Sequence, residues 1–198
     1  MRKAILMSIT ILMPLGIMTG CAGNQDLVRT VSTSTSQSVF KEVEQNVPPA
    51  HGYVDLRIYS SLKTHKSGFH SVNDIHGTPD YKLLLNIDGQ ALLLRGSVKM
   101  ENSEPRGLAD SDAGDGIRYQ FSKRLRLKAG IHRIVVAIPD EGIAVEREIT
   151  LVEGNVNNLV LEPIYNRTPG MRRPGVGNAT NFKEGISGFR LTLNGQGI

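Results

Sequence analysis

Leu83-Leu84-Leu85-Asn86-Ile87-Asp88-Gly89-Gln90-Ala91-Leu92-Leu93-Leu94 is the stretch that decides the fold of this chain. Two apolar runs, each long enough for a strand, flank the dipeptide Asp88-Gly89. This dipeptide favours a tight type I′ turn, because both of its residues must adopt positive φ angles there. The stretch therefore predicts a β-hairpin.

Similar strand patterns run on both sides of this hairpin, separated by turn signals such as Ala129-Gly130. Apolar residues recur with a period of two in most of them, as at Ile134, Val136 and Ile138, which would share one face. No long amphipathic helix interrupts the pattern. The sequence thus predicts an all-β fold, an antiparallel β-sandwich of seven to eight strands. The expected strands are 53–59, 81–87, 91–94, 117–127, 131–138, 145–151, 159–161 and 189–193.

Two stretches do not have a strand pattern. Residues 95–116 become acidic and rich in glycine, and residues 166–185 combine glycines and prolines with several arginines. We expect both to be irregular loops, and long loops of this kind often carry function.

The first twenty-one residues combine positive charge, an apolar run and a cysteine. Arg2 and Lys3 precede the run from Ala4 to Met18, and Thr19-Gly20 leads into Cys21. The run is shorter than the ~20 residues that span a bilayer, and its flanks are those of a secretory signal. This N-terminus resembles the lipobox of bacterial lipoproteins. The resemblance implies cleavage after residue 20 and a diacylglyceryl group on the sulfur of Cys21.

An uncleaved anchor helix and an ordinary signal peptide are the alternatives. Pro14 lies inside the apolar run and disfavours the helix, whereas an ordinary signal would leave Cys21 as a free thiol in an oxidising compartment. In diderm lipoproteins, Asp after the cysteine favours the inner membrane. Ala22 stands there, so the resemblance implies anchoring in the outer membrane, facing the periplasm. Residues 21–50 are polar and are expected to form a flexible tether to a domain at 51–198.

Composition narrows the classes of function. The formal charge of +4 falls to +2 once Arg2 and Lys3 leave with residues 1–20, so it does not favour nucleic acid as a partner. With Cys21 as its one cysteine, the chain has no internal disulfide. Tryptophan is absent, which counts against a dedicated carbohydrate module, because sugars pack on flat aromatic rings.

Three motifs between residues 83 and 161 follow one order. The segment 85–90 ends a strand in Asp-Gly, Gly130-Ile131-His132 precedes an apolar strand, and residues 149–161 contain two closing strands around Glu153-Gly154. In this order they resemble the PEGA-type β-sandwich of bacterial envelope proteins. The Thr-Pro that usually follows the first hairpin is missing, and 95–116 is an insertion. The resemblance implies a binding or spacer module.

Three histidines, His65, His70 and His76, lie in one polar segment with Asp74. Neutral imidazoles are ligands of Zn²⁺ and Cu²⁺, which makes these three the candidate metal ligands. Their spacings of five and six residues match no common metal motif, so a solvated loop is the alternative. His132 is instead expected at the edge of the core, with a ring nitrogen hydrogen bonded to the backbone.

Arg167, Arg172 and Arg173 are the candidate ligand-binding residues of the C-terminal part. Guanidinium groups pair well with phosphates and carboxylates, so lipopolysaccharide, phospholipid headgroups or peptidoglycan are candidate contacts. A solvated loop is again the alternative.

The acidic residues Asp110, Asp112 and Asp115 resemble the start of a calcium loop. Phe121 stands where a closing Glu would be needed, which favours an ordinary acidic turn.

No nucleophile, P-loop or zinc-protease motif is present in the sequence, so we predict no enzyme and no cofactor. The sequence favours a lipid-anchored, non-catalytic structural or accessory binding module. Its expected partners are the membrane, through the lipid, and an envelope protein or polymer that contacts loops 95–116 and 166–185. The alternative is a ligand-binding lipoprotein for a metal ion or an anionic glycan.

Overall fold

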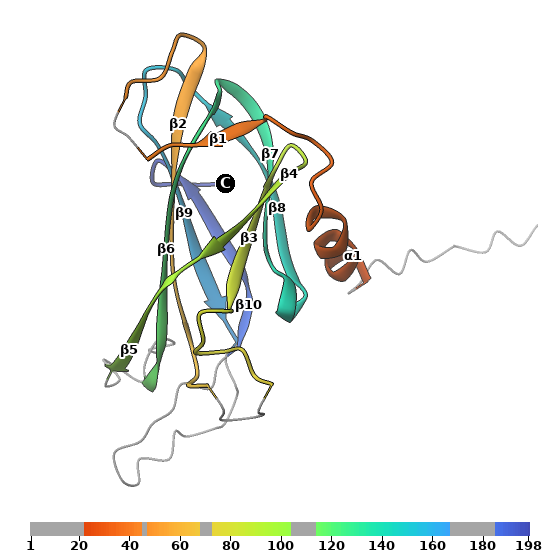
Figure 1. Cartoon of the computed structure of the whole chain (residues 1–198), viewed down its shortest axis with the longest axis vertical. Helices are drawn as coiled ribbons and strands as arrows, with labels where there is room; N and C mark the ends of the chain where they lie inside the picture. The colour runs from red at the N-terminus through yellow and green to blue at the C-terminus, as the bar shows by residue number, and fades with distance from the viewer. Residues whose placement is uncertain (1–21, 45–46, 68–72, 104–113, 167–184) are drawn as a thin grey trace, which may run out of the picture.

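The computed structural model describes residues 22–44, 47–67, 73–103, 114–166 and 185–198. Two β-sheets face each other across one core, and a helix lies outside one of them (Figure 1). The all-β sandwich prediction is confirmed, and all eight predicted strands are present. The elements are α1 (Ala22–Val31), β1 (Phe40–Glu42), β2 (Tyr53–Thr64), β3 (Lys82–Ile87), β4 (Gln90–Arg95), β5 (Ser97–Ser103), β6 (Gly114–Lys128), β7 (Gly130–Ile138), the 3-10 turn η1 (Pro139–Glu141), β8 (Ile143–Leu151), β9 (Asn157–Tyr165), β10 (Ile186–Leu193) and β11 (Gln196–Gly197).

The larger sheet has the order β1-β6-β2-β9-β10-β11, and β5 pairs with the part of β6 that β1 leaves free. The smaller sheet has the order β4-β3-β7-β8. Neighbouring strands are antiparallel except for β2 and β9, which run parallel from Leu56 opposite Asn157 to Ser60 opposite Leu161. The predicted antiparallel pairing therefore has one exception.

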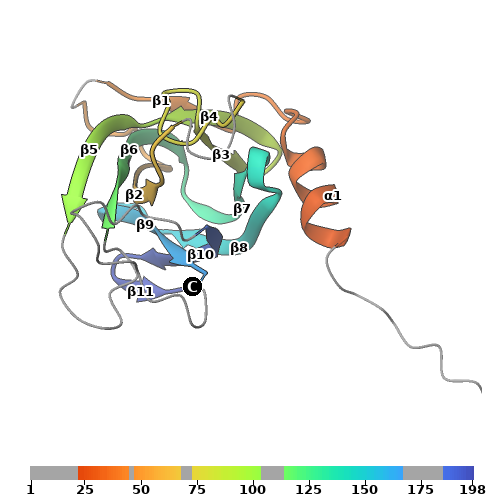
Figure 2. The ribbon, with the colours of Figure 1, turned by 90° about the horizontal axis from the view of Figure 1, so that it is seen from below.

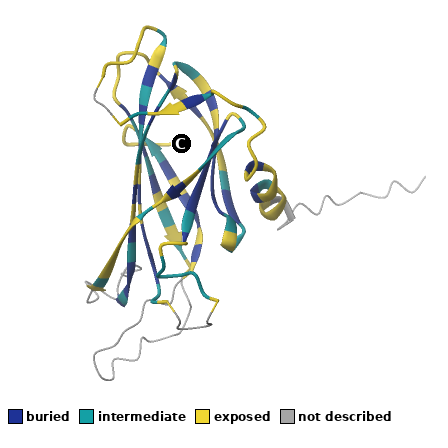
Figure 3. Cartoon of the chain, in the orientation of Figure 1, coloured by how far each residue is buried: buried dark blue, intermediate teal, exposed yellow. Residues whose placement is uncertain are grey.

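The core lies between the sheets and follows the period of two in the sequence. Leu56 of β2, Leu85 of β3, Leu125 of β6 and Ile134 of β7 are all fully buried on the inner faces. Figure 3 shows buried and exposed residues alternating along the larger sheet. Because the chain has no internal disulfide, this apolar burial carries the stability of the domain.

The hairpin between β3 and β4 is the one predicted from Asp88-Gly89. Asp88 has φ 46° and Gly89 has φ 88°, as a type I′ turn requires. Thr35 and Ser36, which follow α1, pack on this turn, and both donate backbone N–H bonds to the carbonyl of Gly89. A Cβ at Gly89 would approach Oγ1 of Thr35 to 2.5 Å.

Gly89→Ala is therefore expected to destabilise the protein by about 2 kcal/mol, from the positive φ and from the contact with Thr35. Gly195 is the matched control, since it has φ 81° in a similar Asn-Gly turn but no atom within 4 Å of an added Cβ. Gly195→Ala should cost about 1 kcal/mol from the backbone alone. Urea unfolding of both variants measures this, and equal losses would show that the contact with Thr35 contributes nothing.

The flexible tether predicted over residues 21–50 needs correction. Residues 22–31 form α1, which packs through Val28 and Val31 on the outer face of the smaller sheet. Figure 2 shows α1 beside β7 and β8. Residues 40–42 then form β1 and pair with β6. The helix forms there because the outer face of this sheet is itself apolar and is otherwise exposed to water.

The irregular loop predicted over residues 95–116 is also wrong for nearly all of the part that the structure describes, residues 95–103 and 114–116. Residues 97–103 form β5, which pairs with β6 from Ser97 opposite Gln120 to Ser103 opposite Gly114. Val98 and Met100 are exposed on this edge strand. Because neither side chain is buried, β5 lacks the alternation of buried and exposed residues that marks a half-buried strand. Residues 104–113 lie outside the described part of the chain, as do 167–184 of the second predicted loop.

None of the described helices is long and apolar enough to cross a membrane.

Candidate metal centre

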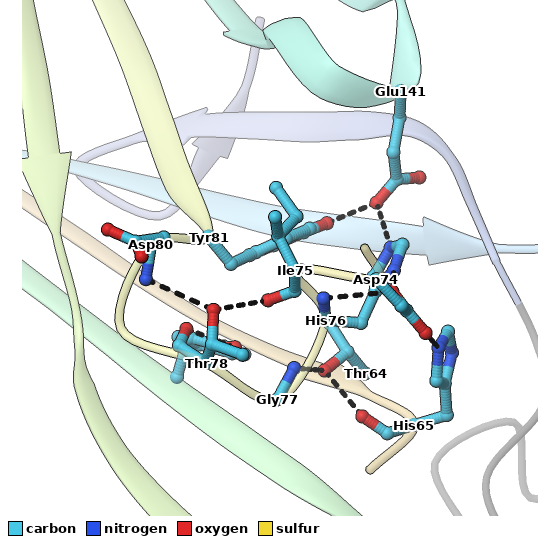
Figure 4. Close-up of polar contacts among 11 residues, drawn as sticks. Thr64, His65, Asp74, Ile75, His76, Gly77, Thr78, Asp80, Tyr81 and Glu141 are labelled. Carbon is cyan, nitrogen blue, oxygen red and sulfur yellow. Dashed lines mark hydrogen bonds and ion pairs between the residues drawn. The ribbon is translucent and has the colours of Figure 1, made fainter. Parts of the chain in front are cut away.

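Three side chains with metal-ligating atoms meet where β2 ends (Figure 4). His65 follows β2 directly, whereas Asp74 and His76 lie in the segment that leads to β3. Nε2 of His65 lies 2.5 Å from Oδ2 of Asp74, and Nδ1 of His76 lies 2.5 Å from Oδ1 of the same carboxylate. One ligand atom from each residue lies within 4.8 Å of the others. We call these three residues the His–Asp–His cluster.

The segment 73–81 is held in place by short-range hydrogen bonds. Oγ1 of Thr78 donates to the carbonyl of Ile75 at 2.7 Å. The backbone N–H of Gly77 donates to Oγ1 of Thr64 at 3.1 Å, which fastens the segment to the last residue of β2. Gly77 has φ 74°, and a Cβ there would lie 2.6 Å from the backbone nitrogen of Ser67. Only glycine fits this close approach.

A second carboxylate lies behind His76. Glu141 ends η1, the tight turn between β7 and β8 that begins at Pro139. Its Oε1 lies 3.3 Å from Nε2 of His76, and the hydroxyl of Tyr81 donates to the same oxygen. Nε2 of His76 therefore donates to Glu141, and this bond fixes the ring with Nδ1 facing Asp74.

These contacts shift the pKa values of His76 and Asp74. The hydrogen bond to Glu141 raises the pKa of His76 above its ordinary value, against the opposing effect of burial. Burial alone would raise the pKa of Asp74, but hydrogen bonds from His65 and His76 hold it well below its usual range. Asp74 is thus an anion with a 7% exposed side chain, and it requires a cation beside it. An imidazolium or a metal ion meets that requirement.

Aromatic rings separate the cluster from the core. The ring centroids of His76 and Tyr81 lie 5.1 Å apart, as do those of Tyr81 and Tyr119. Burial raises the pKa of Tyr119 to about 12, and burial together with Glu141 raises the pKa of Tyr81 further. Both phenols are neutral at pH 7. Their rings form an apolar wall that keeps the charges at this end of the sandwich.

The structure brings two of the three predicted histidines together. His65 and His76 meet at Asp74, whereas His70 lies outside the described residues. The other candidates that lie outside them are Cys21, Arg167, Arg172, Arg173, Asp110 and Asp112. Asp115 is described, and its carboxylate lies 3.7 Å from the ammonium of Lys66.

His132 has the structural place that was predicted for it. It is 8% exposed, and Nε2 lies 2.9 Å from the carbonyl oxygen of Lys128, to which it donates. Nδ1 lies 2.6 Å from Oδ2 of Asp88 in the hairpin turn. The ring fastens the start of β7 to this hairpin.

Sequence reasoning did not find Glu141 or Tyr81. Glu141 stands in the turn Pro139-Asp140-Glu141-Gly142, far from the histidines in the sequence. Pro139 and Gly142 are enough to predict the turn, so Glu141 itself gives no signal. Tyr81 is the first residue of an apolar run and has the pattern of a core residue. No local signal connects either of them to a site.

No protein-family model matches this chain, and neither does any curated protein or solved structure. The resemblance of residues 83–161 to the PEGA-type sandwich stays a prediction.

Proposed function

We propose that this protein is a lipid-anchored envelope module that binds a divalent transition-metal ion through His65, Asp74 and His76. One observation carries the proposal: an anionic, nearly buried carboxylate stands between two imidazole rings, each at 2.5 Å. The metal-binding alternative of the sequence analysis thus has better support than the accessory-module interpretation. The absence of catalysis stays a prediction.

The ligand atoms indicate the class of metal. Two imidazole nitrogens and one carboxylate oxygen suit Zn²⁺, Cu²⁺, Ni²⁺ or Fe²⁺, whereas Ca²⁺ and Mg²⁺ prefer oxygen alone. Tetrahedral ligands at about 2.0–2.1 Å from an ion lie about 3.3 Å from one another. The ligand atoms of the cluster lie within 4.8 Å of one another, so an ion would take the place of the two bridging protons after side-chain shifts of about 1–2 Å. Three protein ligands leave at least one position for water or another small ligand.

The membrane part of the proposal rests on the sequence around Cys21. Its expected lipid would hold the protein in the outer membrane, on the periplasmic side, with several acyl chains that each contribute about 0.8 kcal/mol per buried methylene. The periplasm lacks the reductants that keep iron as Fe²⁺ in the cytosol. Zn²⁺ and Cu²⁺ are therefore the first ions to test.

Calorimetric titration of the mature chain with Zn²⁺ and with Cu²⁺ tests metal binding. We expect one ion per chain, and a loss of affinity of at least about 100-fold in His65→Ala and in His76→Ala. His51→Ala is the control, because His51 is 96% exposed and pairs with Glu153 rather than with the cluster. Wild-type protein that binds neither ion, or variants that bind as well as wild type, would overturn the proposal.

Glu141→Gln is expected to weaken metal binding by about 10- to 100-fold. The amide keeps the shape of Glu141, and its oxygen can still accept from Nε2–H of His76, but it lacks the negative charge that strengthens this hydrogen bond and makes the imidazole a more basic ligand. Tyr81→Phe removes only the hydroxyl that supports Glu141 and should have a smaller effect. The same titration measures both, and a Glu141→Gln variant with wild-type affinity would remove Glu141 from the site.

A further inference from the structure

We infer that the anchored protein rests on the lipid headgroups with the end of the sandwich that carries η1 and the His–Asp–His cluster. This inference rests on the lipid anchor of the proposed function and names the surface that the metal site faces. It follows from where α1 begins, which way it runs, and how firmly it is attached.

The helix that follows Cys21 is bound to the domain. Val28 and Val31 are 7% and 5% exposed and pack on Leu84, Val135, Ala137 and Ala144 of the smaller sheet. Nδ2 of Asn86, which is itself buried, donates to the carbonyl of Val31 at 2.9 Å. A flexible coil over residues 21–50 would allow the domain to lie about 30 Å from the membrane. With α1 packed on the sheet, the anchor and the domain are instead held close together.

The direction of α1 places its first residues beside η1. A Cβ on Gly142, the residue after Glu141, would lie 3.4 Å from Cγ of Gln25. The chain after the helix reaches the β3–β4 turn, where Thr35 and Ser36 donate to Gly89. Figure 1 shows α1 alongside β8, with its first residues toward the end where β7 joins β8.

The lipid is therefore attached close to the metal site. A helix rises 1.5 Å per residue, so Ala22, the residue that directly follows Cys21 in the sequence, lies about 5 Å from Gln25 along α1. Glu141, one residue before Gly142, contacts His76. The opposite end of the sandwich lies beyond the nine residues of β8, about 30 Å away. That end includes Glu153 and Asn155.

Fluorescence quenching tests this orientation with the lipidated chain in phosphatidylcholine vesicles whose headgroups carry a nitroxide. The thiol of Cys21 is blocked by its lipid, so Asp140→Cys and Asn155→Cys each offer one labelling site, one at either end. Both positions are exposed. We expect several-fold stronger quenching at position 140 than at position 155, in metal-free buffer. Equal quenching, or stronger quenching at position 155, would overturn the inference.

A double variant, Val28→Asn with Val31→Asn, is the matched control. It should release α1 from the sheet and make quenching at the two positions nearly equal, and an unchanged difference would show that α1 does not set the orientation. The metal titration is independent of this experiment, so either can fail alone. Mass spectrometry that found Cys21 without lipid would overturn both this inference and the anchor in the proposed function.

Discussion

Asp74→Asn is expected to reduce the affinity for Zn²⁺ by more than about 100-fold while the fold stays intact. The amide has nearly the same volume, and its oxygen can still accept the backbone N–H of His76, which lies 3.0 Å from Oδ1. It has no negative charge, however, and the carboxylate is the one anionic ligand among the three residues. An amide is also a far weaker ligand for a transition metal than a carboxylate.

Asp80→Asn is the matched control for this prediction. Asp80 lies in the same segment, but its side chain is 75% exposed and its carboxylate lies 3.9 Å from the ammonium of Lys82. Titration should give wild-type affinity for Asp80→Asn, and thermal unfolding should show that both variants are folded at the temperature of the titration. Asp74→Asn protein that binds Zn²⁺ within about threefold of wild type would show that Asp74 is not a ligand of the ion and that its carboxylate only hydrogen bonds to His65 and His76.

The sequence predicts this site in part. His65 and His76 are recognisable as candidates because imidazoles crowd one polar segment, and Asp74 lies between them. The spacing alone did not show that their rings come to 4.5 Å from each other, because a hydrogen bond from Gly77 to Thr64, which no local pattern indicates, joins the two segments. Glu141 reaches His76 only through the pairing of β3 with β7, which brings the start of one strand to the end of the other. Contacts of that kind depend on the register of the sheet, which no local pattern shows.

The strands were predictable where one face is apolar and the other is polar. The helix was missed because it covers a second apolar face, which the pattern of one strand does not assign to any partner. Ile134, Val136 and Ile138 give a clear inner face, but Val135 and Ala137 between them are equally apolar. A strand with two apolar faces needs a cover on each side. That signal predicts an element over the smaller sheet, although it does not say which. The cover is α1, whose two buried valines are too few to make a polar segment look like a helix.

Asp55→Asn is expected to destabilise the protein by about 2–3 kcal/mol at pH 7. The side chain is 10% exposed on the outer face of β2, and it accepts hydrogen bonds from Arg124 at 2.6 Å and from Arg126 at 2.8 Å. Both arginines stand on β6, and Arg124 lies directly opposite Arg57 of β2. Without the carboxylate, three cations face one another across the two strands, which adds repulsion to the lost bonds.

The pH dependence of this loss separates charge from packing. The hydrogen bond from Arg126, with that from Arg124, holds the pKa of Asp55 below its usual value of 3.8, although burial opposes the shift. A carboxyl with a lowered pKa in the folded state stabilises fully above its unfolded pKa and loses that contribution as the pH falls through its folded pKa. The difference in the free energy of unfolding between wild type and Asp55→Asn, measured with urea, should therefore be constant from pH 7 to about 5 and shrink below about pH 4.

Glu162→Gln is the control. Glu162 and Arg190 lie 3.7 Å apart, and their side chains are 52% and 70% exposed, so this pair should contribute less than about 0.5 kcal/mol. A loss at Asp55 that does not change down to about pH 2.5 would mean that the donor NH₂ group of the amide beside the two arginines, and not the lost negative charge, destabilises β2 and β6.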